Sequence, residues 1–116
     1  DGCVHMWGTG EEERDLLHID DLVRFVDMSL KNQKQQYGLY NVGLGSGISI
    51  INLVREIITQ SGKNLDIIHD LSKPTIKTSL YLNCEKAKNE IGWSPEISLK
   101  EGIRMTLDWY EENIRD

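Results

Sequence analysis

The sequence contains few residues that form cross-links or bind metal. Its 116 residues include only two cysteines, Cys3 and Cys84, and three histidines. Nothing around the two cysteines indicates that they pair, and Cys3-Val4-His5 lacks the second pair of ligands that a zinc site requires. Unpaired cysteines are typical of a reducing compartment. We therefore expect a cytoplasmic protein without a metal site.

The sequence also lacks the charge and hydropathy of a nucleic-acid or membrane protein. It has 13 lysines and arginines against 19 acidic residues, a net charge of −6, which repels phosphate backbones and anionic lipid. No apolar run approaches the roughly 20 residues of a membrane span, and no signal peptide is visible. With 39% hydrophobic and 28% charged residues, the composition is typical of a soluble globular protein that binds neither nucleic acid nor membrane.

The length is sufficient for one modest domain, which we place over residues 1–116. No internal repeat or low-complexity segment divides it. The chain begins with Asp1 rather than methionine. This start is expected for an excised piece of a longer protein, although a tag or processing would also explain it.

Helical spacing and turn residues predict the order of the elements. Asp20 or Asp21 is expected to cap a first helix, whose apolar face has Leu22, Phe25, Val26 and Leu30. A strand over 39–42, a glycine turn, a helix capped by Ser49 and stopped by Gly62, and a strand over 65–68 together predict a βαβ unit with parallel pairing.

The remaining elements complete a predicted α/β fold. Residues 2–7 have strand or loop character, and residues 78–82 are consistent with a short strand. Asn83 is expected to cap a short helix that Gly92 ends. Ser98 and Glu101 match a capping box, which predicts a long C-terminal helix with an apolar face formed by Leu99, Ile103, Thr106, Leu107, Tyr110 and Ile114.

The glycine turn at residues 43–47 follows a predicted strand and precedes a helix, as a dinucleotide-binding loop does. The Gly-x-Gly-x-x-Gly fingerprint fails, however, because position 48 is Ile48. No suitably placed acidic residue follows to hold a ribose. We therefore interpret the segment as a structural turn and expect no cofactor-binding residue in this chain.

Trp7 and Arg14 are the candidate ligand-binding residues of the first loop. Gly8 and Gly10 punctuate this loop, and an arginine at its end could hold phosphate while the tryptophan stacks on a base or sugar. The alternatives are simple packing for Trp7 and pairing with Glu11 to Glu13 for Arg14. His18 is interpreted as a packed or helix-neighbouring histidine, and Trp93 as a core anchor before Pro95.

Six motifs occur in an order that resembles the C-terminal third of the NAD(P)-dependent epimerase/dehydratase family, the extended short-chain dehydrogenases that act on nucleotide sugars. The resemblance covers nearly the whole chain. The motifs are Trp7-Gly8-x-Gly10, Arg14-Asp15-x-x-His18-x-Asp20-Asp21-Leu22, Asn41-x-Gly43-x-Gly45, Ser72-Lys73-Pro74, Gly92-Trp93-x-Pro95 and Ser98-Leu99-x-Glu101-Gly102-Ile103. The Ser-Lys-Pro loop and Trp109-Tyr110 look most like the GDP-L-fucose synthase branch.

The resemblance implies a nucleotide-diphosphate sugar as ligand. In that branch the residues matching Trp7 and Arg14 contact the nucleotide sugar, and across the family the matching arginine binds the diphosphate. Lys73 would neutralise the second charge, unless it is simply exposed. Thr75, which we include in the expected substrate-binding set, replaces the carboxylate usual in that branch, so the sugar and the base stay open.

The family's glycine-rich cofactor motif and its Tyr-x-x-x-Lys catalytic pair do not occur in this sequence and would precede Asp1. We therefore expect no catalytic residue here, NAD or NADP bound by an N-terminal Rossmann domain outside this chain, and no turnover by the fragment alone. Surface left open by that domain predicts self-association, with a homodimer expected. The rival hypotheses are a non-catalytic nucleotide-sugar-binding module and a protein-interaction module.

Overall fold

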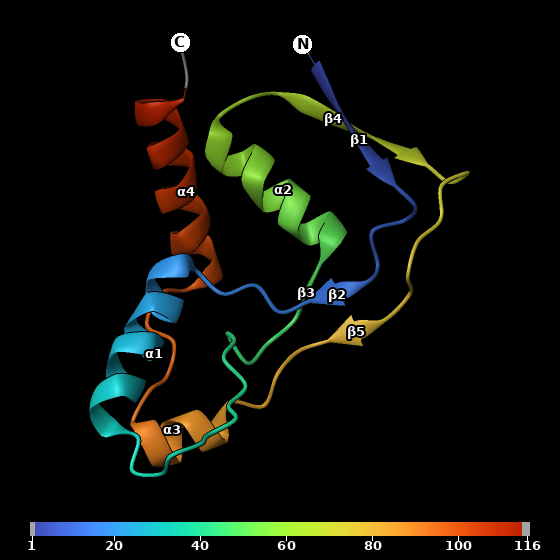
Figure 1. Cartoon of the computed structure of the whole chain (residues 1–116). Coiled ribbons are helices and arrows are strands. Elements are labelled where there is room, and N and C mark those ends of the chain that lie inside the picture. Colours follow the sequence, from blue (N-terminus) through green and yellow to red (C-terminus); the bar gives the residue numbers. More distant parts are fainter. Residues whose placement is uncertain (1, 115–116) are drawn as a thin grey trace.

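The structure, a computed structural model, describes residues 2–114 and has the predicted α/β character (Figure 1). The chain forms four helices and two small sheets, and the strands of each sheet come from distant parts of the chain. In chain order the elements are β1 (Gly2–Trp7), β2 (Glu13–Arg14), α1 (Ile19–Asn32), β3 (Ile48–Ser49), α2 (Ile50–Ser61), β4 (Leu65–Asp70), β5 (Ser79–Leu80), α3 (Glu85–Ile91) and α4 (Leu99–Asn113).

Strands β1 and β4 form a parallel pair, in register from Gly2 opposite Leu65 to Trp7 opposite Asp70. The segment whose strand or loop character the sequence left open is therefore a strand. The prediction of a strand at 65–68 is confirmed, and the strand continues to Asp70. Because the pair is parallel, the segments that follow β1 and β4 leave it at the same end.

The second sheet has the strand order β3-β2-β5, so that β2 is its central strand. Glu13 and Arg14 pair with Ser49 and Ile48 in antiparallel fashion on one side. On the other side they pair in parallel with Ser79 and Leu80, respectively. The short central strand therefore joins two segments that lie more than 30 residues apart in the sequence.

The predicted strand at 39–42 is wrong, since these residues belong to no strand. Hydrogen bonds to the α3 region, rather than to a neighbouring strand, hold this segment. Lys86 Nζ donates to the carbonyl of Leu39 at 2.9 Å, and the side-chain amide of Asn41 donates to the carbonyl of Asn83 at 3.3 Å. The predicted βαβ unit is consequently replaced by the β1–β4 pair, whose connection contains α1 and α2.

Most predicted helix ends are confirmed. Ser49 and Ser98 accept hydrogen bonds from the amides of Asn52 and Glu101, and Gly62 and Gly92 end α2 and α3 in the left-handed region. Two caps differ from the prediction. His18, rather than Asp20 or Asp21, caps α1 through Nδ1, and Cys84 occupies the cap position of α3, where Asn83 accepts the amide of Glu85.

The predicted apolar face of α1 is wrong for three of its four residues. Phe25 packs against the core, whereas Leu22, Val26 and Leu30 are exposed. The inward face of the helix instead combines Phe25 and Met28 with the polar residues Asp21 and Arg24, at spacings that also place them on one side. The core beneath this face consists of Ala87, Ile91 and Trp93.

Helices α2 and α4 meet over an apolar cavity of about 220 Å³. Leu53 and Ile57 of α2 line it together with Leu99, Ile103 and Leu107 of α4, which confirms the inner part of the predicted α4 face. Tyr110 and Ile114 remain exposed, against the prediction. Other elements therefore cover the C-terminal end of α4 only loosely.

The molecule is flat and extended for its length. Its Cα radius of gyration is 17.1 Å and its extents are 54 × 35 × 18 Å, whereas a compact domain of this length has a radius of about 13 Å. Its accessible surface of 8378 Å² exceeds by about 1,900 Å² the value expected for a compact monomer of its mass. Among the described residues, no helix is long and apolar enough to cross a membrane.

Candidate functional site

Two loops leave the carboxyl ends of β1 and β4 and converge again at the β2–β5 pair (Figure 1). The first covers residues 8–12 and the second residues 71–78. At the near end, the amide of Gly8 donates to the carbonyl of Asp70 at 2.9 Å, and at the far end the amide of Glu13 donates to the carbonyl of Thr78 at 3.1 Å. In α/β proteins, ligands bind outside the carboxyl ends of parallel strands, which makes these two loops the candidate site.

Trp7, Lys73 and Thr75 lie together at the near end of the loops. The Lys73 Nζ atom is 5.7 Å from the centre of the Trp7 ring, within the range of a cation–π contact. More than half of the Trp7 surface, 57%, is exposed. Within the described residues Trp7 is therefore not packed into a core, and its role as a ligand contact stays a prediction.

Gly8 brings the two loops into direct contact. Its φ of 71° lies in the left-handed region, and a Cβ at this position would lie 2.3 Å from Cγ2 of Thr75. The carbonyl of Gly8 also lies 2.9 Å from Nδ1 of His69. A side chain at residue 8 would consequently push apart the loops that present Trp7 and Thr75.

Arg14 lies at the far end of the loops and is half-buried. Its Nη1 atom donates to the carbonyls of Glu13 and Thr78, at 2.7 and 2.9 Å, and to the Thr78 hydroxyl at 3.3 Å. Within the described residues it forms no ion pair with Glu11, Glu12 or Glu13, so the alternative of a pairing with these glutamates is wrong.

The Nη1 contacts leave the other edge of the Arg14 guanidinium available. Nε and Nη2 point along the edge that carboxylates and phosphates use for two parallel hydrogen bonds, and among the described residues this edge has no hydrogen-bond partner. A cavity of about 220 Å³ lies at this end of the loops and is lined by Glu11, Glu12, Lys77, Thr78 and Ser79. The guanidinium edge itself can donate to an anion with two adjacent acceptor groups, whereas the Glu11 and Glu12 carboxylates that line the cavity oppose an anion there.

The glycine turn contains an internal anion. The carboxylate of Asp15 accepts hydrogen bonds from the amides of Leu44 and Gly45, at 2.6 and 2.9 Å. These are the amides that would face a phosphate in a dinucleotide-binding loop. The turn therefore does not fit NAD or NADP, and no step of a reaction is assigned to a cofactor bound there.

Sequence reasoning missed the role of Asp15, although its motif was part of the resemblance. The residue follows Arg14 on an extended segment, where successive side chains point to opposite sides. The signal that could have indicated it is a carboxylate next to the arginine that is predicted to bind phosphate, together with a glycine turn that fails the fingerprint.

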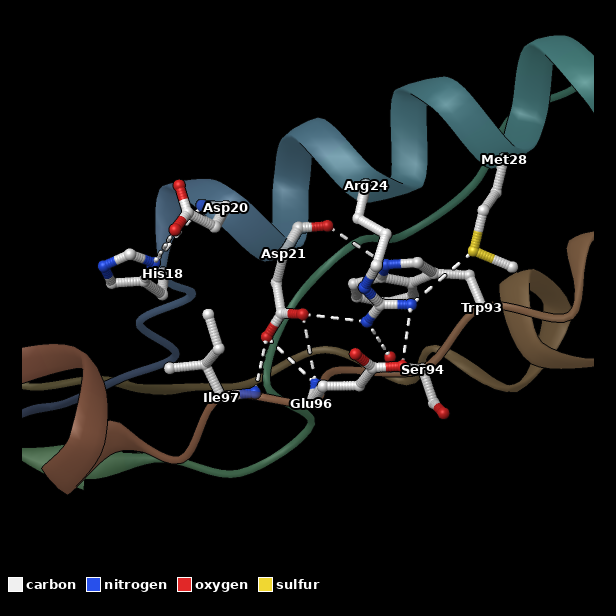
Figure 2. A network of polar contacts seen from close by, with 9 residues as sticks. All are labelled: His18, Asp20, Asp21, Arg24, Met28, Trp93, Ser94, Glu96 and Ile97. Carbon is white, nitrogen blue, oxygen red and sulfur yellow. Dashed lines mark hydrogen bonds and ion pairs between the residues drawn. The ribbon is translucent and has the colours of Figure 1, made fainter. Parts of the chain in front are cut away.

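A second polar cluster holds the fold together away from the loops (Figure 2). Asp21 is 1% exposed and its carboxylate accepts hydrogen bonds from the amides of Glu96 and Ile97, at 2.9 to 3.1 Å, and from Arg24 at 2.8 Å. Burial would raise the pKa of Asp21, but these donors outweigh burial and hold the pKa below its ordinary value. The indole nitrogen of Trp93 donates to the Asp21 carbonyl at 3.0 Å.

The described residues offer no metal centre, since they contain no group of three or more potential ligands. His18 caps α1, as its interpretation as a helix-neighbouring histidine predicted, and Cys3 and Cys84 are both free thiols. The structure thus assembles the predicted residues into two clusters, with Trp7, Lys73 and Thr75 at one end of the loops and Arg14 at the other.

Comparison with known proteins gives a consistent result. The model of the GDP-mannose 4,6 dehydratase family matches residues 2–106. GDP-L-fucose synthase 1 of Arabidopsis thaliana is 33% identical over 96% of this chain and 34% of its own length. The dTDP-glucose 4,6-dehydratase of Bacillus anthracis, solved with NAD, is 30% identical with a TM-score of 0.79, over 97% of this chain and 35% of that one.

A third relative was solved with a nucleotide sugar. The UDP-glucose 4-epimerase of Thermotoga maritima, in a structure with UDP-glucose, is 29% identical with a TM-score of 0.81, over 97% of this chain and 36% of that one. The chain therefore spans about a third of the length of the proteins it matches. These three matched proteins are a GDP-L-fucose synthase, a dTDP-glucose 4,6-dehydratase and a UDP-glucose 4-epimerase.

Proposed function

Since the chain belongs to the GDP-mannose 4,6 dehydratase family, within the NAD-dependent epimerase/dehydratases, we propose that it binds the nucleotide-diphosphate end of a nucleotide sugar. The whole enzyme would be an epimerase, dehydratase or reductase that uses NAD or NADP. The observation that carries this proposal is the open Nε–Nη2 edge of Arg14, held in place through Nη1 at the meeting point of two loops.

Arg14 would bind the diphosphate. A guanidinium suits two adjacent phosphoryl groups because it offers donors in a fixed fork, and the Thr78 carbonyl and hydroxyl fix the direction of that fork. Lys73 would add a second positive charge, while Trp7 would stack on the base or sugar and Thr75 would shape the loop beside Gly8. Binding this remote end would position the reacting sugar carbon.

We further propose that this chain is the substrate-binding C-terminal portion of the enzyme, and that a Rossmann domain outside it supplies the cofactor site and the catalytic pair. The excess surface of about 1,900 Å² supports this proposal, because a standard interface buries only about 800 Å² on each partner. The occupied glycine turn is consistent with a cofactor bound elsewhere. The enzyme would be a cytoplasmic homodimer, which light scattering of the complete protein would test.

The proposal is tested by nucleotide-sugar binding to variants of the complete enzyme. Arg14→Ala should weaken binding of GDP-L-fucose or UDP-glucose, whichever binds more tightly, by about 2 kcal/mol, or roughly 30-fold, because a charge-assisted contact is lost. Arg14→Lys should restore only part of the affinity, since an ammonium keeps the charge without the fork.

The matched control is Arg55→Ala, which removes another guanidinium. Arg55 is exposed on α2 and contacts Asn52 of its own helix at 3.4 Å, so its loss should leave the affinity unchanged. Isothermal titration calorimetry measures all three variants. Unchanged affinity in Arg14→Ala would end the diphosphate assignment, and the absence of nucleotide-sugar binding by the unmodified enzyme would favour the interaction-module hypothesis.

A further inference from the structure

The Asp15 carboxylate connects three segments that are distant in sequence. One oxygen accepts the amide of Leu44 at 2.6 Å. The other accepts the amides of Gly45 and Leu82, at 2.9 and 3.1 Å. The side chain of Asp15, which directly follows β2, is thus hydrogen-bonded both to the glycine turn and to the chain that follows β5.

The β5 segment is held at both ends by neighbouring residues of the β2 region. Before β5, the carbonyl of Thr78 accepts Nη1 of Arg14, and after β5 the amide of Leu82 donates to Asp15. Between these points β2 and β5 are paired in parallel (Figure 1). The partner that orients the Arg14 guanidinium therefore belongs to a segment that Asp15 anchors at its other end.

The Asp15 carboxylate lies directly against Gly43 of the glycine turn. A Cβ at Gly43 would lie 2.7 Å from Oδ2 and 3.0 Å from Cγ of Asp15. The Cys84 thiol lies on the other side of this turn and donates to the Gly43 carbonyl at 3.6 Å. Only a residue without a side chain fits between the carboxylate and the turn at this position.

We propose that Asp15 is a positioning residue for the Arg14–diphosphate contact, an inference that rests on the proposed function. Asp15 does not touch the ligand. It acts by fixing the segment that carries Thr78, and hence the direction of the open guanidinium edge. Without the carboxylate, three backbone amides from two segments lose their acceptor, and the β5 segment keeps only its pairing with β2 and its contacts at Thr78.

The first test is Asp15→Asn in the complete enzyme, with GDP and UDP as probes and calorimetric affinity as the readout. The amide retains one acceptor but turns a donor toward amides that need an acceptor. We expect the affinity for the tighter-binding nucleoside diphosphate to fall about tenfold. Wild-type affinity in a folded Asp15→Asn variant would overturn the proposal.

The matched control is Asp21→Asn, which removes an equivalent carboxylate. Asp21 also accepts two backbone amides, those of Glu96 and Ile97, but it lies in the cluster away from the loops. This variant should lower the melting temperature while leaving nucleoside-diphosphate affinity within about twofold of wild type. Equal losses of affinity in both variants would overturn the proposal, since they would reflect general destabilisation.

A double-mutant cycle separates positioning from an independent contribution. If Asp15 acts through Arg14, the variant Arg14→Ala/Asp15→Asn should bind no more weakly than Arg14→Ala alone. Additive losses would overturn the inference but leave the diphosphate assignment of Arg14 intact. Unchanged binding in Arg14→Ala would instead overturn the proposed function and, with it, this inference.

Should Asp15→Asn fail to fold, Gly43→Ala takes its place in the same cycle. The added methyl group displaces the Asp15 carboxylate while keeping its charge in the protein. We again expect a loss of about tenfold that disappears in the Arg14→Ala background. Wild-type affinity in Gly43→Ala would overturn the proposal.

Discussion

Replacing Trp93 with alanine should remove the centre of the small core. The indole is 0% exposed and packs against Ala87 and Ile91. The Phe25 ring meets it edge-on, with ring centres 5.6 Å apart, and the Arg24 guanidinium lies 5.8 Å from its centre. No other aromatic side chain in the described part of the chain is fully buried.

The expected loss has two contributions. Truncating a buried tryptophan to alanine costs about 3–5 kcal/mol, because packing is lost and a cavity remains. The Asp21 carbonyl, which accepts the indole N–H at 3.0 Å, loses its donor at a further cost of about 1 kcal/mol. A domain of this length has a total stability of roughly 6–17 kcal/mol, so the variant should be close to unfolding. Trp93→Phe, which keeps a ring, should lose about 1–2 kcal/mol.

Urea unfolding followed by circular dichroism at the helical band measures these losses, because fluorescence would change with the tryptophan itself. Trp109→Ala is the matched control: Trp109 lies on α4 with 57% of its surface exposed, and its truncation should cost less than about 1 kcal/mol. Equal unfolding midpoints for Trp93→Ala and Trp109→Ala would refute the assignment of Trp93 as the core anchor.

Two further predictions concern acid stability and thiol reactivity. Because the pKa of Asp21 is lowered in the folded state, its stabilising contribution is present above the ordinary value near 3.8 and is lost as the pH falls through the folded-state pKa. The variant Asp21→Asn should therefore be less stable at pH 7, and its stability should depend less on pH in acid. An unchanged acid transition in this variant would contradict the prediction. Burial raises the pKa of the Cys84 thiol, and the nearby Asp15 charge adds to this effect. Ellman's reagent should therefore modify exposed Cys3 about tenfold faster than Cys84, and equal rates would count against the burial of Cys84.

Local signals in the sequence predicted local structure well. Ser49 and Ser98 cap helices, and Gly62 and Gly92 end them, because these roles depend on backbone groups within four residues. The strand expected at 39–42 failed for the opposite reason. A strand needs a neighbour, and Lys86 of α3 binds that segment instead.

Long-range contacts explain the other errors. Asp21 matched the pattern of a helix cap, but its carboxylate binds amides 75 and 76 residues later in the chain, which no local pattern indicates. The candidate site was predicted from a resemblance spread over nearly the whole sequence, and the structure brings Trp7, Lys73 and Thr75 together. Asp15 was missed because its three partners come from two distant segments.

The most direct measurement of the central claim is a melting-temperature screen of the complete protein against GDP-, UDP-, dTDP- and CDP-sugars, with the corresponding free sugars as controls. A ligand that binds the folded state raises the melting temperature in proportion to its affinity and concentration. We expect at least one nucleotide sugar to raise it and the free sugars to leave it unchanged, with the rise reduced in Arg14→Ala. A screen in which no nucleotide sugar changes the melting temperature would contradict the account.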